Sequence, residues 1–324
     1  MNVQRSKVVP RANNPRPYPG DKTWIFLLGN AFFTPKGGMH VGKFLVFQTD
    51  FGLSDGAVSA MYGVALSVDP NLRIFDLTHE IPQYNIWEAS YRLYQTITYW
   101  PKGTVFVSVV DPEVGTDRRS VAVRTETGHT IITPDNGTLT HIKRKIGLTS
   151  AVVIDEVKNR LPNTFDSYTF DGRDIFAYTG ARLASGVIGF EEIGQFLNVD
   201  SVVELPVKEA VIKDQAVIGC IDILDVRFGN LWTNIPQQLF KQYGAKYGDT
   251  FEVTIENETH QVYKNMMTFG RSFADSHLGE PLLYVNSLGN IGVAINQGSF
   301  ASAYHIKSGI NWKITIRKIP FHHH

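Results

Sequence analysis

The chain has very little cysteine: Cys220 is the single one among 324 residues. One cysteine excludes an intramolecular disulfide and argues against a cysteine-based metal cluster. A reducing compartment is compatible with this, and we expect a cytoplasmic protein. The chain also has no excess of either charge, because lysine plus arginine and aspartate plus glutamate number 31 each. No global field therefore favours nucleic acid or an anionic membrane as a partner.

Long hydrophobic runs are missing as well. The apolar run over residues 24–33 is interrupted by Gly29 and Asn30, and it is shorter than the roughly 20 apolar residues that span a bilayer. It follows a basic, proline-rich start, but no A-x-A-like cleavage site comes after it. We expect residues 1–40 to be an extension that is disordered or lies upstream of a natural start near Met39. We assign no metal to the terminal histidines, residues 322–324.

Several familiar motifs are absent. No G-x-G-x-x-G follows the first predicted strand and no Walker A sequence occurs, so dinucleotide-binding and P-loop interpretations lose their main support. G-x-S-x-G is absent too, which argues against an α/β-hydrolase.

The first half of the chain alternates predicted strands with predicted helices. Strands are expected at residues 43–48, 73–77 and 104–110, separated by amphipathic helices at 57–68 and 85–99. A hairpin over residues 120–133, a strand at 151–154 and a helix opening at 170–174 follow. This order predicts a Rossmann-like α/β domain with a mostly parallel sheet, over residues 41–207.

The second half has a different pattern. Short alternating runs at residues 216–223, 250–255, 260–263, 282–285 and 312–316 indicate antiparallel strands. We expect a small antiparallel β-barrel or sandwich over residues 213–320, with barrel as the leading choice.

Aspartate and asparagine gather in the loops that follow the predicted strands. Ligands of open α/β sheets bind at the carboxyl ends of the strands. Such side chains bind ribose hydroxyls, hold a divalent metal, or cap helices and turns. The residues are Asp50, Asp55, Asp111, Asp135, Asn136, Asp171 and Asp174.

Seven segments in order carry a family resemblance. They are Thr49-Asp50-Phe51-Gly52 with Asp55, Asp76-Leu77-Thr78-His79-Glu80-Ile81-Pro82, residues 111–118, Pro134-Asp135-Asn136-Gly137, Phe170-Asp171-Gly172-Arg173-Asp174, residues 225–234, and Asn286-Ser287-Leu288-Gly289. Each is weak alone. Together they resemble the S-adenosyl-L-methionine (SAM) hydroxide adenosyltransferases, relatives of fluorinases and chlorinases, over roughly residues 43–317.

The resemblance implies an enzyme that hydrolyses SAM to adenosine and L-methionine by attack of water or hydroxide at the ribose 5′ carbon. It implies SAM as substrate without a cofactor or metal. It also implies a homotrimer whose sites lie between the N-terminal domain of one subunit and the C-terminal domain of another.

Asp111 and Arg118 match the family's catalytic aspartate and arginine. A sulfonium is already a good leaving group, so the difficulty lies in holding a small nucleophile in line behind the carbon and accepting its proton. Halogenases carry uncharged residues at these positions, so the charged pair favours water over halide. The alternative is that Asp111-Pro112 only opens a turn and Arg118 is solvated.

Two departures from the family pattern stand out. Asp171 occupies the place of the family's histidine, and it either replaces that histidine in catalysis or caps the helix that follows. A second carboxylate near Asp111 needs compensation, for which Arg118 and Arg173 are the candidates. Glu113 replaces a glycine, and a positive φ there would be costly.

The resemblance also implies the residues that bind the substrate. Asp50 would bind the ribose diol, although alone it suggests an Asx-turn. Phe228 would stack on adenine with Asn230 at the base edge, and Trp232 either joins them or belongs to the barrel core. Asp225 and Ser287 match positions that hold the methionine amino group; otherwise they lie in surface turns. Leu288 stands where fluorinases carry an arginine.

Three other functions stay open. The missing histidine suggests a weakly catalytic or non-catalytic protein that binds SAM or adenosine, and a halide-using halogenase is a second alternative. A third interpretation takes the aspartate-rich loops as a Mg²⁺-dependent phosphoesterase, which activity surviving EDTA would exclude.

Overall fold

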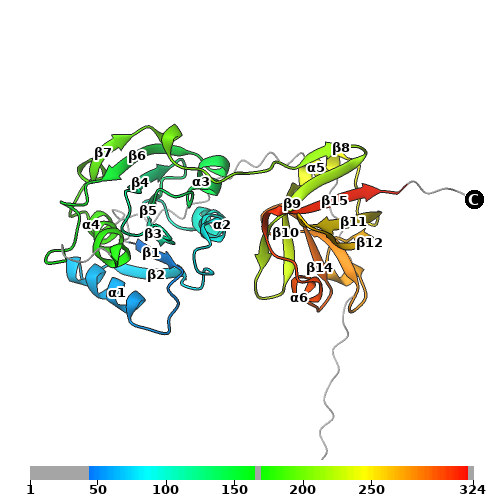
Figure 1. Ribbon diagram of the computed structural model, residues 1–324, viewed down its shortest axis with the longest axis horizontal. Helices are drawn as coiled ribbons and strands as arrows, with labels where there is room; N and C mark the ends of the chain where they lie inside the picture. The colour runs from blue at the N-terminus through cyan, green and yellow to red at the C-terminus, as the bar shows by residue number, and fades with distance from the viewer. Residues whose placement is uncertain (1–43, 165–168, 320–324) are drawn as a thin grey trace, which may run out of the picture. The chain divides into compact units, whose positions relative to one another are not determined.

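The computed structural model describes residues 44–164 and 169–319 (Figure 1). The predicted extension over residues 1–40 and the terminal histidines lie outside the described residues.

The first sheet has seven strands in the order β2-β1-β3-β5-β4-β6-β7. Its parallel part comprises β1 (Phe44–Thr49), β2 (Arg73–Thr78), β3 (Val105–Val109) and β5 (Thr130–Pro134). Its antiparallel part comprises β4 (Ser120–Thr125), β6 (Leu148–Ile154) and β7 (Gly194–Leu197). The carboxyl ends of β1 and β3 therefore lie side by side, where the predicted aspartates follow them.

Helices cover both faces of this sheet (Figure 1). They are α1 (Ala57–Val68) and α4 (Tyr178–Ser185) on one face, and α2 (Ile86–Thr96) and α3 (Thr140–Lys145) on the other. Alternate residues of β1 serve the two faces: Leu45 and Phe47 pack in the cluster with Met61 of α1, whereas Val46 packs with Leu93 of α2. The period of two in a strand explains why these strands read as continuous apolar runs.

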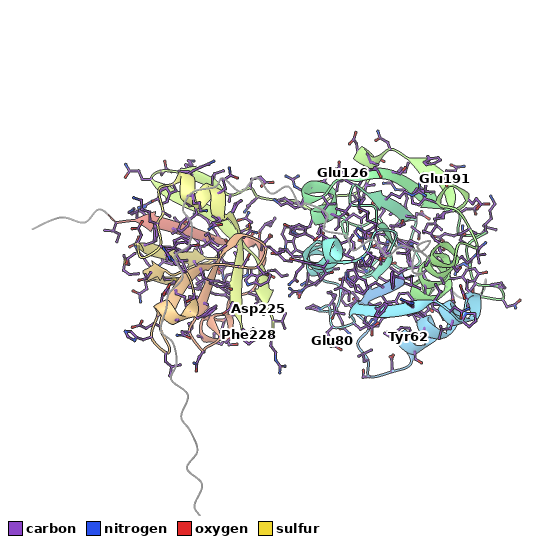
Figure 2. All side chains as sticks on the ribbon, turned by 180° about the vertical axis from the view of Figure 1, so that it is seen from behind. Tyr62, Glu80, Glu126, Glu191, Asp225 and Phe228 are labelled. Atoms are coloured by element: carbon purple, nitrogen blue, oxygen red, sulfur yellow. The ribbon has the colours of Figure 1, made fainter. Side chains whose placement is uncertain are left out.

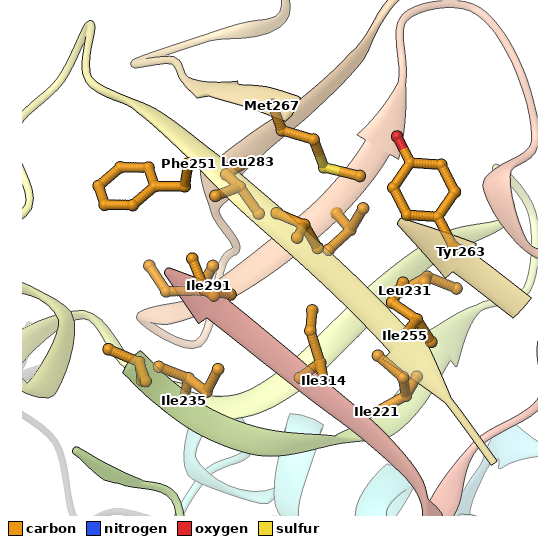
Figure 3. Close-up of a cluster of buried hydrophobic side chains, with 14 of the residues drawn as sticks. Ile221, Leu231, Ile235, Phe251, Ile255, Tyr263, Met267, Leu283, Ile291 and Ile314 are labelled. Atoms are coloured by element: carbon orange, nitrogen blue, oxygen red, sulfur yellow. The ribbon is translucent and has the colours of Figure 1, made fainter. Parts of the chain in front are cut away.

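The second sheet closes on itself into a barrel. The strands are β9 (Ala216–Asp225), β10 (Asn230–Pro236), β11 (Thr250–Glu256), β12 (Gln261–Phe269), β13 (Pro281–Val285), β14 (Asn290–Ile295) and β15 (Gly309–Lys318). Pairing of β9 with β10 completes the ring, and β8 (Val211–Lys213) pairs with β9 in an antiparallel manner outside the ring. Figure 3 shows the core, where Ile221, Leu231 and Ile314 are fully buried.

Short helical segments complete the fold. They are α5 (Gln237–Gln242), α6 (Phe300–Tyr304), a π-helical turn (Gly172–Ala177) before α4, and 3₁₀ turns at Ile97–Tyr99, Phe190–Glu192, Val199–Ser201 and Phe273–Asp275. In the described ranges, no helix is long and apolar enough to cross a membrane.

The predicted fold class is confirmed: a mostly parallel α/β domain is followed by a β-barrel, and the sandwich alternative is wrong. The barrel differs from the prediction in one respect, because β12 and β13 pair in parallel. Residues 270–280 connect these two strands and carry the chain back, so that β13 runs in the same direction as β12.

Candidate active site

The turn after β3 brings Arg118 back to Asp111. The backbone N–H of Glu113 donates to Asp111 Oδ1 (3.3 Å), and the Thr116 hydroxyl donates to the Glu113 carbonyl (2.7 Å). The positive φ that this turn requires, 81°, falls on Gly115. Glu113 does not have a positive φ, so the strain considered for its replacement of glycine does not arise.

Asp111 and Arg118 form a buried ion pair, not a solvated turn. Arg118 Nε and Nη2 donate to Asp111 Oδ2 at 2.9 and 2.6 Å, and each side chain is 5% exposed. Burial by itself lowers the pKa of the Arg118 guanidinium, but the hydrogen bond and charge of Asp111 outweigh it and raise that pKa. Arg118 is therefore a permanent cation that holds one oxygen of Asp111.

Asp171 joins the same cluster from the start of the next helical segment. Its Oδ2 accepts from Arg118 Nη2 at 3.0 Å and its Oδ1 accepts from Arg160 Nη2 at 3.1 Å. Asp171 occupies the N-cap position but its side chain makes no capping hydrogen bond, so the capping alternative is wrong. Gly172 permits this packing, since an added Cβ would lie 2.9 Å from the Phe51 ring.

Arg160 and Glu156 complete the cluster, and they were not among the residues selected from the sequence. Arg160 is 6% exposed and lies 3.8 Å from Glu156, which accepts a 2.7 Å hydrogen bond from the Ser120 hydroxyl. With Asp111, Asp171 and Glu156 against Arg118 and Arg160, three negative charges face two positive ones, a formal net charge of −1. Glu156 and Arg160 are four residues apart in sequence, and this i, i+4 spacing was the one signal that could have selected them. Such pairs are common on exposed surfaces.

The other strand-end side chains have structural partners. Arg173, one candidate to compensate Asp171, instead pairs with the buried Asp174 at 2.6 Å. Asp135 pairs with Arg119, and the Asn136 amide donates to the Val110 carbonyl.

A cavity of about 360 Å³ lies against this cluster, and Asp50, Asp111 and Asp171 all line it. Phe51 and Phe170 form an apolar part of its wall, with ring centroids 5.8 Å apart. We call it the carboxylate cavity. A fourth carboxylate, Asp55, also lines it and accepts from the Ala57 backbone N–H at 2.8 Å. Asp50, Asp111 and Asp171 come from the ends of β1 and β3 and from the start of the π-helical turn, so the topology brings together residues up to 121 positions apart in sequence.

Asp50 is not in an Asx-turn with its own loop. Its Oδ2 accepts from the Tyr84 backbone N–H at 2.8 Å. Burial raises the pKa of Asp50 and the charge of Asp111 adds to this, while backbone hydrogen bonds oppose it. Within residues 44–164 and 169–319, no side chain donates to its other oxygen, Oδ1, and Asp50 lines the cavity.

A hydrogen-bond chain that runs from the buried Thr49 and His79 to the exposed Asp76 supports the loop that carries Asp50. Thr49 Oγ1 lies 2.8 Å from His79 Nδ1, and His79 Nε2 lies 2.8 Å from Asp76 Oδ1. Tyr62 donates to the same Asp76 oxygen; Figure 2 labels Tyr62 in the first domain. Thr49 is fully buried, so this chain supports the loop and offers no nucleophile.

A second cavity, of about 980 Å³, lies on the barrel domain. All five barrel residues proposed from the sequence line it: Asp225, Phe228, Asn230, Trp232 and Ser287. We call it the barrel cavity. Figure 2 shows Asp225 and Phe228 close together at the turn between β9 and β10, and Phe228 is 67% exposed.

Trp232 does not belong to the barrel core, because it packs with Tyr284 in a separate cluster and not with Leu231. It is 8% exposed, its indole N–H donates to the Tyr284 hydroxyl at 3.0 Å, and it also lines the cavity. Burial raises the pKa of Tyr284 to about 12, so the hydroxyl that accepts this bond is neutral at physiological pH. Across residues 44–164 and 169–319, no three His, Cys, Asp or Glu side chains group as a metal site would require.

Comparison with known proteins agrees with the two-domain architecture. The N-terminal domain model of the SAM hydroxide adenosyltransferases matches residues 45–194, and the C-terminal domain model matches residues 219–313. An (R)-S-adenosyl-L-methionine hydrolase of Salinispora tropica is 34% identical, over 83% of this chain and 96% of the relative. A fluorinase of Actinopolyspora mzabensis is 28% identical, over 84% and 96%.

A solved structure is similar over the same span. The crystal structure of an uncharacterized conserved protein from Thermotoga maritima has a TM-score of 0.75 and 31% identity, and it covers 85% of this chain and all of that one. With both domain models matched in order, the chain belongs to the SAM hydroxide adenosyltransferase family, whose members act on SAM as substrate.

Proposed function

We propose that this protein hydrolyses SAM to adenosine and L-methionine. The observation that carries the proposal is the buried Asp111–Arg118 pair, in which two N–H groups of Arg118 hold one carboxylate oxygen of Asp111 while Asp111 lines the carboxylate cavity. Within the described part of the chain, Asp111 Oδ1 accepts one long backbone hydrogen bond of 3.3 Å, so this oxygen is available to orient a water. Homologues named as SAM hydrolases support the same reaction.

The proposed reaction is an in-line displacement at the ribose 5′ carbon. The oxygen of water forms a bond to C5′ while the C5′–sulfur bond breaks, and the bonding electron pair goes to sulfur as the neutral thioether of methionine. Asp111 accepts the proton of the water and returns it to solvent. Its main contribution is orientation, because the sulfonium needs no protonation to leave.

Charge in the carboxylate cavity supports water over halide. Asp50, Asp111 and Asp171 line it together, and the adjoining cluster has one more negative than positive charge. A halide entering this space would meet repulsion, whereas a cationic sulfonium is attracted.

We assign Asp171 a positioning role. Both of its oxygens accept hydrogen bonds from guanidinium groups, those of Arg118 and Arg160. A carboxylate held in this way is a poor proton acceptor, but it fixes the orientation of Arg118 and hence of Asp111. Arg160 holds Asp171 directly, and Glu156 lies 3.8 Å from Arg160.

We further propose a homotrimer in which the carboxylate cavity of one subunit faces the barrel cavity of another. Exposed apolar side chains line both cavities: Tyr84 is 68% exposed at the first and Phe228 is 67% exposed at the second. Such side chains are expected to be covered by a ligand or a second copy.

Incubation with SAM tests the proposed reaction. Because relatives carry the name (R)-SAM hydrolase, both isomers at the sulfonium should be assayed, with and without chloride and EDTA. Adenosine and methionine are expected in equal amounts, unaffected by EDTA, with no 5′-chloro nucleoside. A chlorinated product would reassign the protein as a halogenase. Tight binding without products would favour the second candidate, a SAM-binding protein, which the replacement of the family histidine by Asp171 suggests.

The pH dependence of nucleoside binding tests Asp50. Only the ionised carboxylate accepts from both ribose hydroxyls, so affinity for adenosine should fall as pH drops through the raised pKa of Asp50, above the ordinary value of about 3.9. Asp50→Asn should weaken binding at neutral pH and remove this pH step, which calorimetric titration would measure. An unchanged affinity would remove Asp50 from the site.

At neutral pH the same substitution should weaken nucleoside binding but increase the free energy of unfolding. With a raised pKa, the folded state binds the proton more tightly than the unfolded state, so ionisation of Asp50 opposes folding as pH rises through that window. Compared with wild type at the same pH, Asp50→Asn should therefore gain more free energy of unfolding at neutral pH than at acidic pH. This separates a loss of binding from a loss of fold.

A further inference from the structure

The amino-acid part of the proposed substrate has two charges that the barrel cavity must match. An ammonium needs an acceptor such as the Ser287 hydroxyl, and a carboxylate needs a donor, preferably a guanidinium. Leu288 cannot supply one: it is half-buried against a cluster that includes Trp232 and Tyr284. Two arginines line the cavity, Arg227 and Arg271.

Strand register separates these two arginines. β12 runs parallel to β13, with Thr268 opposite Leu282 and Phe269 opposite Leu283. The Gly270 N–H donates to the Leu283 carbonyl at 2.9 Å, so the chain continues along β13 and brings Arg271 level with Val285, just before the turn at residues 286–289.

Arg227 belongs to the other end of the cavity. It lies in the β9–β10 turn beside Phe228, and the strand that follows pairs Leu231 with Val293. This turn therefore lies beside the C-terminal end of β14, whereas Ser287 precedes the N-terminal end of β14. Stacking on Phe228 and a contact at Ser287 would place the base near Arg227 and the amino acid near Arg271.

The guanidinium of Arg271 has no carboxylate partner among the described residues, and Arg271 lines the same cavity as Ser287. Asp275 accepts from the Arg271 backbone N–H at 2.7 Å, not from its side chain. The guanidinium carbon lies 5.5 Å from the Tyr247 ring centroid, and that ring stacks on Phe269 at 4.6 Å.

Tyr247 also ties this position to the turn at residues 286–289. Its hydroxyl accepts from the Gln237 side chain at 3.3 Å, and the Gln237 backbone N–H donates to the Gly289 carbonyl at 2.9 Å. A planar guanidinium resting on an aromatic ring keeps its edge N–H groups available for a bidentate anion.

We propose that Arg271 binds the α-carboxylate of the substrate and makes the site selective for sulfonium nucleosides that carry one. This assignment rests on the proposed function. It places the cation on the segment after β12, in place of an arginine at position 288.

Decarboxylated SAM, which keeps the sulfonium and the amine but lacks the carboxylate, is the matched probe. Wild type, Arg271→Gln, Arg271→Lys and, as control, Arg227→Gln should be assayed with SAM and with this analogue. Arg271→Gln should raise KM for SAM about ten- to a hundredfold, the range for a hydrogen bond to a charged group. Its kcat and its KM for the analogue should stay unchanged, and lysine should restore part of the loss.

The outcomes separate this inference from the proposed reaction. Equal KM changes for the two compounds, or loss of selectivity in Arg227→Gln alone, would overturn the role of Arg271 while leaving SAM hydrolysis intact. If wild type turns over neither compound, the proposed reaction fails, and calorimetric affinities for the same pair test Arg271 directly. Absence of binding to both compounds would overturn both proposals.

Discussion

Replacing Asp111 with asparagine is expected to lower kcat for adenosine formation about a thousandfold, the middle of the range for a positioned proton acceptor. Asparagine keeps the shape and an oxygen for Arg118, whose Nη2 now lies 2.6 Å from Asp111 Oδ2. What it removes is the charge that accepts the proton of the attacking water. Single-turnover kinetics would measure the chemical step, and calorimetry would show that affinity for SAM is largely kept.

Asp135→Asn is the matched control for that experiment. Asp135 is a buried aspartate at a neighbouring strand end, paired with Arg119, and it does not line the carboxylate cavity. The control should keep its kcat even where its thermal stability falls. Normal turnover in Asp111→Asn would remove Asp111 from the chemistry.

Replacing Arg118 with alanine is expected to lower the free energy of unfolding by about 3–5 kcal/mol, because removing one partner of a buried ion pair leaves its charge uncompensated. Here two carboxylates are affected, Asp111 and Asp171, each with a side chain 5% exposed. Arg160 would still hold Asp171, whereas Asp111 would lose its guanidinium partner. Denaturant unfolding monitored by fluorescence measures this loss.

Arg144→Ala provides the comparison on the surface. Arg144 also bridges two carboxylates, Glu204 and Glu209, but its side chain is 38% exposed. Its loss should cost less than about 1 kcal/mol, since water screens exposed pairs. Equal losses of unfolding free energy in Arg118→Ala and Arg144→Ala would show that burial does not increase the cost of breaking the Asp111–Arg118 ion pair.

Much of the fold was predictable because its signals are local. Residues 105–109 are apolar except for Ser108 and become the buried strand β3, and the stripe containing Met61 and Ala65 becomes the inner face of α1. Strands β10 and β14 of the barrel and the short strands β7 and β8 were not predicted. The last two have the clearest reason. Four and three residues long, and mostly exposed or half-buried, they have no periodicity to detect.

The candidate site was predictable only in part. Asp111 and Arg118 are seven residues apart on one turn, so their pairing follows from a local motif. Arg160 pairs with Asp171 from outside any recognised segment, and an arginine in a loop usually signals a solvated side chain. Its 6% exposure results from packing between the end of β6 and the π-helical turn.

By itself, the sequence determined the order of strands and helices, the family resemblance and the residue types at strand ends, because these depend on periodicity and on short motifs. Tertiary structure decided which charges meet. It joined Arg118 to Asp171 across 53 positions and set Arg271 level with Val285 through the parallel pairing of β12 and β13. Such contacts depend on sheet order and register, which bring distant segments together and have no local sequence signal.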